Sequence, residues 1–241
     1  MAQIDTSIGR IENQLLARLP ASDLRRLRSM LTTVLLKPKQ VLQKQGERVR
    51  HVYFPNSGLV SLTTALADGS LVEAATIGDN GIVGIEAFLE SDAVSPCEAI
   101  VQVPIPGQTA EMMRVTDFRH EINRGGPLRD ASARYLHVLY AQTARLTACN
   151  ARHSVNERCA RWLLTAQDQM HRPTFHLSQE FLGVMLGVRR QAVSEVATSF
   201  RTAGLIRYQH GAITVLDRKA LEGTACECYA ALADLRKSCG T

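Results

Sequence analysis

The hydrophobic residues of this chain first recur at helical spacing and then at strand spacing. Leucines at 15, 16 and 19 and at 24, 27 and 31 flank a Pro20-Ala21-Ser22 break, which predicts two short helices. From Val34 to about Ile105, short runs alternate between apolar and polar residues, with turn signals at Asp68-Gly69, residues 78–81 and residues 104–107. This pattern predicts an antiparallel β domain of short strands, a barrel or a roll.

A long helical pattern begins after Gly125-Gly126-Pro127 and continues for about 45 residues. Its apolar stripe comprises Leu128, Tyr135, Leu139, Gln142 and Leu146, extended by Leu136, Thr143 and Cys149. Two surfaces could cover this stripe: the β domain of the same chain, or the same helix of a second copy. Because the helix lies between two unlike domains, contact with a second copy is at least as well supported as contact with the β domain of the same chain. A further helix, at about 155–169, is expected to begin the C-terminal domain.

The stretch LSQEFLGVMLGVRRQAVSEVATSFRTAGLIRY, residues 177–208, predicts two helices separated by a glycine turn. Ser178 suits the N-cap of the first helix, and Gly187 is expected to end it. The second helix is expected from about Arg189 to Ala203, with its apolar stripe facing the core. The polar residues left on its outer face are Arg189, Arg190, Gln191, Ser194, Glu195, Thr198 and Arg201.

These outward residues have the chemistry of a major-groove reader. Arginine matches the edge of guanine, glutamine that of adenine, and a carboxylate accepts a hydrogen bond from cytosine, while serine and helix N-terminal amides bind phosphates. A hairpin pairing Leu205–Tyr208 with Ala212–Leu216 across residues 209–211 is expected to follow as a wing. The alternative is an ordinary helical hairpin with a solvated face. The expected DNA-binding residues are Ser178, Gln179, Arg189, Arg190, Gln191, Ser194, Glu195, Arg201 and His210.

Composition and charge agree with a folded protein that binds a polyanion. The chain has 241 residues, 45% of them hydrophobic, which is enough for one large or two ordinary domains. No signal-peptide pattern and no apolar run of membrane-spanning length is found, so we expect a cytoplasmic protein. Between His51 and Met113 there are eight acidic residues and no Lys or Arg, whereas the C-terminal half is basic.

Taken together, these segments resemble the Crp/Fnr family of bacterial transcription regulators over nearly the whole chain. The resemblance rests on LLARLP, VYFPNSGLVSL, VEAATIGDNGIVGIEAFL, VNERCARWLL and the stretch at 177–208, in the family's order. It implies an α+β fold with a cyclic-nucleotide-binding-like β-roll sensor at 1–126, a dimerisation helix at 127–152 and a winged helix-turn-helix at 153–241. It also implies a homodimer that binds double-stranded DNA at an inverted repeat, and contact with RNA polymerase if the protein is an activator.

The resemblance places Arg190, Gln191, Ser194 and Glu195 at the family's DNA-contacting positions. Gln191 stands where many relatives have glutamate, and Glu195 where many have arginine, so the preferred half-site is expected to differ from the family's best-known ones.

The sensor lacks the residues with which cyclic-nucleotide-binding relatives hold the phosphate. Those relatives use a Gly-Glu pair and, further on, an Arg-Ser or Arg-Thr pair, whereas Gly84 is followed here by Ile85, and Ser95-Pro96 stands at the arginine position. A buried phosphate without a cation is costly. We therefore expect neither a cyclic nucleotide nor another cofactor. The candidate effector pocket comprises Gly84, Glu86 and Ser95, with Arg129 and Arg134 reaching from the long helix.

Three alternatives remain open. Cys226 and Cys228, with Cys239 nearby, could make a redox- or metal-responsive regulator, although their spacing alone assigns no metal site. Haem ligation by His51, His120 or His137 is a further route to sensing. In a different class, the helix-turn-helix could be a protein-interaction module that does not bind DNA. An enzyme is not expected, because the strand region lacks paired metal-binding histidines and the chain lacks a GxSxG elbow or a phosphate loop.

Overall fold

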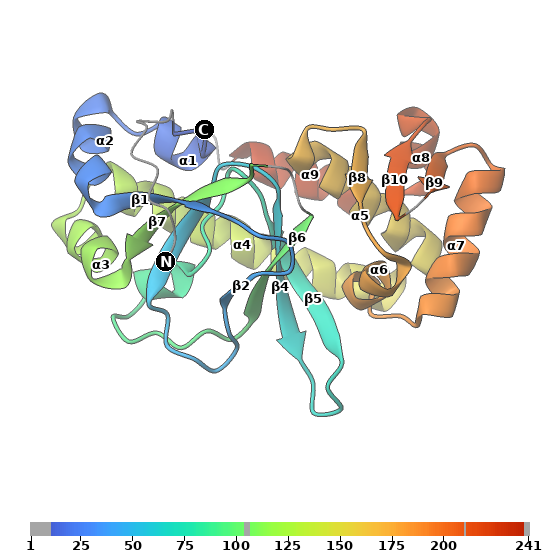
Figure 1. Cartoon of the computed structure of the whole chain (residues 1–241), viewed down its shortest axis with the longest axis horizontal. Coiled ribbons are helices and arrows are strands. Elements are labelled where there is room, and N and C mark those ends of the chain that lie inside the picture. Colours follow the sequence, from blue (N-terminus) through green and yellow to red (C-terminus); the bar gives the residue numbers. More distant parts are fainter. Residues whose placement is uncertain (1–10, 104–106, 210, 239–241) are drawn as a thin grey trace.

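The computed structural model describes residues 11–103, 107–209 and 211–238. Its N-terminal half consists of short antiparallel strands and small helices. Two sheets, in strand orders β1-β7-β3 and β2-β6-β4-β5, face each other and make the expected β-roll (Figure 1). Val52 and Phe54 of β3 are fully buried between them, together with Phe118. The elements are α1 (Gln14–Ala17), α2 (Ala21–Leu27), η1 (Arg28–Met30), β1 (Leu31–Leu35), β2 (Val41–Gln43), β3 (His51–Pro55), β4 (Leu59–Ala65), β5 (Leu71–Ile77), η2 (Ile85–Phe88), β6 (Glu98–Val103), β7 (Thr109–Arg114) and α3 (Val115–Arg124).

The roll agrees with the sequence prediction in one detail and differs from it in another. A tight turn is present at Asp68-Gly69, as predicted: the Gly69 amide donates to the Leu66 carbonyl at 2.9 Å, and the Leu66 amide donates to the Ser70 carbonyl at 2.9 Å. The roll also extends past the predicted strand region, because β7 joins β1 to β3, and α3 then packs under them.

Strand β4 is buried on both faces, which alternation alone did not predict. Val60 and Leu62 point into the roll, whereas Leu59 belongs to the hydrophobic core of the C-terminal domain. Ser61, on the same outer face, lies 3.4 Å from the sulfur of Met185. The roll and the C-terminal domain therefore share an interface along β4 and β5.

The long helix α4 (Pro127–Arg152) runs behind the roll and continues to the C-terminal domain (Figure 1). Proline at its first turn, after two glycines with positive φ, fixes where it begins. Leu128, Tyr135 and Leu146 are buried within the chain itself. Much of the predicted stripe thus packs on the chain's own domains, and a seam to a second copy has to use another face of α4.

The C-terminal domain is a winged helix-turn-helix, as predicted. Its third strand, β8, pairs with the hairpin and was not predicted. The first strand of the hairpin is shifted by one residue from the prediction, because Gln209 pairs with Ala212 and so belongs to the strand. The elements are α5 (Val155–Met170), β8 (Thr174–His176), α6 (Gln179–Leu186), α7 (Arg190–Thr202), β9 (Ile206–Gln209), β10 (Ala212–Val215), α8 (Arg218–Thr224) and α9 (Cys228–Ser238).

A buried carboxyl group joins the roll to this domain. Glu73 of β5 accepts hydrogen bonds from the Trp162 indole at 2.9 Å and from the Ser61 hydroxyl at 2.5 Å. Burial raises the pKa of Glu73 to about 7, although both hydrogen bonds and the charge of Arg161 oppose the rise. At the rim of the interface, His171 contacts the Asp79 carboxylate at 3.0 Å.

Among the described helices, none is long and apolar enough to cross a membrane.

Candidate nucleic-acid interface

The turn between α6 and α7 is fixed by two glycines. The Ser178 hydroxyl caps α6 by accepting from the Phe181 amide at 3.1 Å. Gly187 ends the helix with φ of +63°, and the next amide, that of Val188, donates back to the Gly183 carbonyl at 2.9 Å. A methyl group on Gly183 would lie 2.8 Å from the Val188 carbonyl, so a larger residue would force the turn open. The turn sets the direction in which α7 leaves α6.

Helix α7 buries one side and exposes the side that was predicted to read DNA. Val193, Val196, Ala197 and Phe200 are buried against α5 and β9, and Arg189 stands at the N-cap. The predicted readers Arg189, Arg190, Gln191, Glu195 and Arg201 are exposed, and Ser194 is half-buried. Figure 1 places α7 at the outer edge of the molecule, away from the roll. The far end of α7 lies away from the roll, whereas its start lies near β5, where a methyl group on Gly187 would be 3.8 Å from Val72.

Two of the predicted base readers are paired with each other in the free protein. The Gln191 amide nitrogen donates to the Glu195 carboxylate at 3.2 Å, one helical turn along the exposed face. Contact with a base edge would replace this surface hydrogen bond, which is worth little in water.

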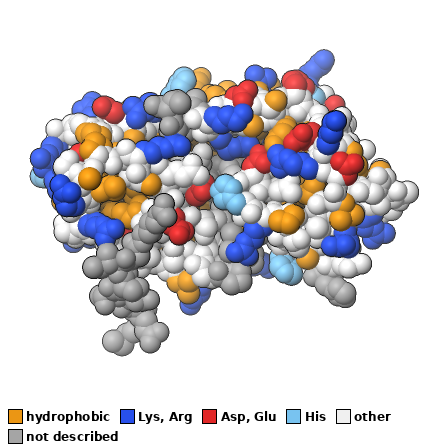
Figure 2. Space-filling model, turned by 90° about the horizontal axis from the view of Figure 1, so that it is seen from above, with side chains coloured by type: hydrophobic (Ala, Val, Ile, Leu, Met, Phe, Trp, Pro, Cys, Tyr) orange, Lys and Arg blue, Asp and Glu red, His pale blue; other side chains and the backbone are white. Residues whose placement is uncertain are grey.

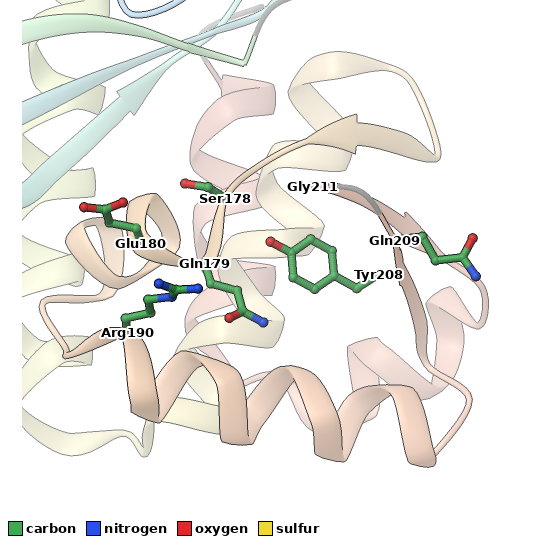
Figure 3. Close-up of a pocket in the computed structure, with 7 residues that line it drawn as sticks. All are labelled: Ser178, Gln179, Glu180, Arg190, Tyr208, Gln209 and Gly211. Carbon is green, nitrogen blue, oxygen red and sulfur yellow. The ribbon is translucent and has the colours of Figure 1, made fainter.

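An open hollow of about 370 Å³ separates the start of α6 from the wing hairpin. Figure 3 shows the Arg190 side chain extending from the start of α7 toward Gln179. The Tyr208 hydroxyl donates to the Leu177 carbonyl at 2.9 Å, and burial raises the pKa of this tyrosine. The lining is polar, as a site for a phosphate backbone requires. It consists of Ser178, Gln179, Glu180, Arg190, Tyr208, Gln209 and Gly211.

Ser178, Gln179 and Arg190 of this hollow were predicted to bind DNA, whereas Glu180 and the wing residues Tyr208, Gln209 and Gly211 were not. Tyr208 was expected as an ordinary strand residue and Gln209 as part of the wing turn, and only the folded hairpin of β9 and β10 places them beside α6. Their polarity in a short strand next to a glycine was the available signal. His210, which was also predicted to bind DNA, lies outside the described residues.

The predicted effector residues of the roll lie at η2 and in the loop before β6, whereas the two predicted arginines lie on α4. Gly84 has φ of +83°, and a methyl group there would lie 2.8 Å from the His51 carbonyl. Glu86 follows in η2, and burial raises the pKa of its carboxyl group. Ser95 is buried, and its hydroxyl donates to the Cys97 carbonyl at 2.7 Å.

Arg129 and Arg134 are exposed on α4, and within the described residues neither forms an ion pair. The cation nearest to η2 comes instead from α3. Arg119 donates to the carbonyls of Ala87 and Phe88, at 3.2 and 2.8 Å. It thus binds the carbonyl end of η2, so the role of the two α4 arginines in an effector pocket stays a prediction.

The cysteines predicted as a redox or metal pair are part of a larger group. Cys226 and Cys228 lie with Cys149 and His153 of the long-helix end, within 4.8 Å of one another, a gathering that the sequence spacing did not indicate. Burial raises the pKa of the Cys149 thiol to about 12. Cys239 lies outside the described residues.

Positive charge is spread over the molecule on either side of the acidic strands. Figure 2 shows Lys and Arg side chains over the helices of the N-terminal end as well as over the C-terminal domain. The strand region between His51 and Met113 contains no Lys or Arg. The roll strands are therefore the part of the chain least suited to a polyanion.

Two families of domains match the chain in sequence. The cyclic nucleotide-binding domain family matches residues 33–106, and the Crp-like helix-turn-helix domain family matches residues 157–224. The matched ranges coincide with the roll and with the domain that carries α6 and α7. No curated protein sequence matches the chain.

Solved structures of Crp/Fnr regulators share this fold. TTHB099, a CRP-family transcriptional regulator from Thermus thermophilus, is 23% identical with a TM-score of 0.66, over 81% of this chain and 99% of that one. TTHA1359, a CRP/FNR-family regulator from the same organism, is 22% identical with a TM-score of 0.65, over 80% and 97%. FixK2 from Bradyrhizobium japonicum is 19% identical with a TM-score of 0.63, over 81% and 98%. With both domains of the family in the family's order, and with its fold, this chain belongs to the Crp/Fnr family of transcription regulators.

Proposed function

We propose that the protein is a sequence-specific DNA-binding regulator that reads an inverted repeat as a homodimer, and that it acts by binding and not by catalysis. The observation that carries the proposal is the exposed first half of α7, where Arg190, Gln191, Ser194 and Glu195 lie on one face behind a glycine-fixed turn. This face supplies a bidentate donor for guanine, an amide for adenine and a carboxylate for cytosine. The polar hollow beside it suits the neighbouring phosphates.

The homodimer is supported by the outward face of α4. Tyr140 is 73% exposed there, in a row that also contains His137 and the small residues Ala133, Ala144, Thr147 and Ala151. Small residues allow two helices to approach closely around the tyrosine rings. Two copies joined along α4 would present two α7 helices. Such a pair matches a palindromic site whose half-sites are about 34 Å apart.

The effector is left unassigned in the proposal, and a cyclic nucleotide is not favoured. No Lys or Arg lies between His51 and Met113 to pair with a phosphate. Glu86 of η2 is half-buried, and its carboxylate would repel an anion bound beside it. Any ligand would act by shifting the balance between arrangements of the two α7 helices.

Duplex binding by Arg190→Ala tests the proposal, with Arg48→Ala as the matched control. Arg48 is an arginine of the roll, 72% exposed, whose loss removes the same charge far from α7. We expect Arg190→Ala to weaken binding by about 1–3 kcal/mol and to relax the preference at one base pair, with Arg48→Ala near the parent. Parent binding should also fall steeply as salt rises. If Arg190→Ala binds every duplex as the parent does, α7 is not the reading helix. Binding that is absent or independent of salt would favour the protein-interaction alternative.

A further inference from the structure

Three cysteines and one histidine meet where the end of α4 touches the start of α9. Cys149 lies in the last turn of α4, and His153 is the residue at which that helix ends. Cys226 and Cys228 flank the start of α9, more than 70 residues later in the chain. The three sulfurs form a buried cluster of their own, separate from both domain cores. Neither DNA reading nor the roll interface uses these residues.

The spacing of the four side chains fits a tetrahedral metal ion. The sulfurs of Cys149 and Cys226 are 3.6 Å apart, and the Cys228 sulfur lies 3.9 Å from Nδ1 of His153. All four atoms lie within 4.8 Å of one another. Thiolates bound to tetrahedral zinc at about 2.3 Å lie about 3.8 Å apart. A disulfide would instead require two sulfurs at about 2.05 Å, and the three cysteines are free.

A second observation, independent of the sulfurs, is the orientation of the histidine. Nε2 of His153 contacts the Glu227 carboxylate at 3.1 Å, from the residue between the two cysteines of the C-terminal segment. When Nε2 carries the proton that this carboxylate accepts, Nδ1 presents a lone pair to the sulfurs. Metal-binding histidines are held in this manner by a carboxylate on their other nitrogen.

The surroundings suit a closed, negatively charged metal centre. Cys149, Cys226 and Cys228 are at most 5% exposed, so bulk water has little access to the sulfurs. Three thiolates, a neutral histidine and a divalent cation carry one net negative charge. Arg161 of α5 is 4% exposed, and its Nε atom has no hydrogen-bond partner among the residues that the structure describes. It acts electrostatically on Cys149. Its guanidinium can offset that charge in a region of low dielectric constant.

We propose that Cys149, His153, Cys226 and Cys228 bind a zinc ion that fastens α9 to the end of α4. Four protein ligands complete a tetrahedral shell and leave no position for a substrate, which is the arrangement of structural zinc. Helix α9 also packs on α5, where Arg236 pairs with Asp168 at 3.0 Å. The ion therefore fixes the first helix of the DNA-binding domain relative to the long helix.

Metal analysis of the purified full-length protein tests this site. We expect zinc in equimolar amount with the chain, and loss of most of it in Cys149→Ser and Cys228→Ser. Cys97→Ser is the matched control, because this half-buried thiol lies in the roll near Thr64 and should leave the zinc content unchanged. Circular dichroism identifies a variant that fails to fold.

Two measurements keep the test valid if the serine variants unfold. Co²⁺ added to the metal-free wild-type protein should give the visible absorption of tetrahedral thiolate coordination, and zinc should abolish that absorption. Glu227→Gln keeps all four ligands, so the variant should still bind zinc. It should lose the ion to a competing chelator at a chelator concentration about 10- to 100-fold lower than the wild-type protein requires. Purified protein without zinc and without the Co²⁺ spectrum would overturn the proposal. So would a Cys149–Cys226 disulfide in the freshly isolated protein, or serine variants that keep their zinc.

Discussion

Replacing Glu73 by glutamine should stabilise the protein at alkaline pH and leave it nearly unchanged at acidic pH. Glu73 is 5% exposed, and its pKa rises from 4.5 to about 7 because burial penalises the charged form. The unfolded chain releases this proton around pH 4.5, whereas the folded protein keeps it up to about pH 7. The stability that the protonated group contributes is therefore complete below about pH 4.5 and is lost as the pH rises to about 7.

Each pKa unit corresponds to about 1.4 kcal/mol, so this loss amounts to about 3 kcal/mol. Glutamine reproduces the neutral acid: its carbonyl can accept from the Trp162 indole and its amide can donate to Ser61, the two present partners. Urea unfolding of wild type and Glu73→Gln at pH 5 and pH 8 measures the difference. We expect the variant to be more stable by up to about 3 kcal/mol at pH 8, and by little at pH 5. An equal difference at the two pH values would refute the reasoning.

Two further variants test the turn and the dimer. Gly187→Ala should cost about 1–2 kcal/mol of unfolding free energy, because φ is +63° and the added methyl group meets only Val72 at 3.8 Å. Gly223→Ala adds the same methyl to helix α8 with nothing within 4 Å, so it should be neutral or stabilising in the same denaturation assay. Tyr140→Glu should raise the dissociation constant of the dimer on the order of 10- to 100-fold in sedimentation, since it places a charge in the seam. Unchanged self-association would exclude the outward face of α4 as that seam.

The helices could be predicted from the sequence wherever a short motif determines the backbone conformation at their ends. Pro127 after two glycines fixed the start of α4, and Ser178 and Gly187 fixed both ends of α6. The exposed side of α7 followed from the apolar stripe ending in Phe200, because a helix that buries one side must expose the other. These are properties of adjacent residues, for which sequence spacing is sufficient.

Contacts between segments that are far apart in the chain could not be predicted from the sequence. Glu73 is one acid in an acidic stretch, and only the packing of the roll on the C-terminal domain places it against Trp162. Cys149 lay in the apolar stripe of the long helix, and the fold alone brings it to Cys226. The burial of Leu59 on the outer face of β4 likewise depends on the neighbouring domain. In each case the partner lies more than 70 residues away, where no periodicity connects the two.

Selection of bound sequences from a random duplex library, with purified protein and no added ligand, tests the central claim most directly. The account predicts enrichment of an inverted repeat with half-sites about one helical turn apart, and loss of preference at one position of each half-site for Arg190→Ala. A wild-type protein that enriches no sequence, or the same repeat recovered by Arg190→Ala, would contradict the assignment of α7 as the helix that reads DNA.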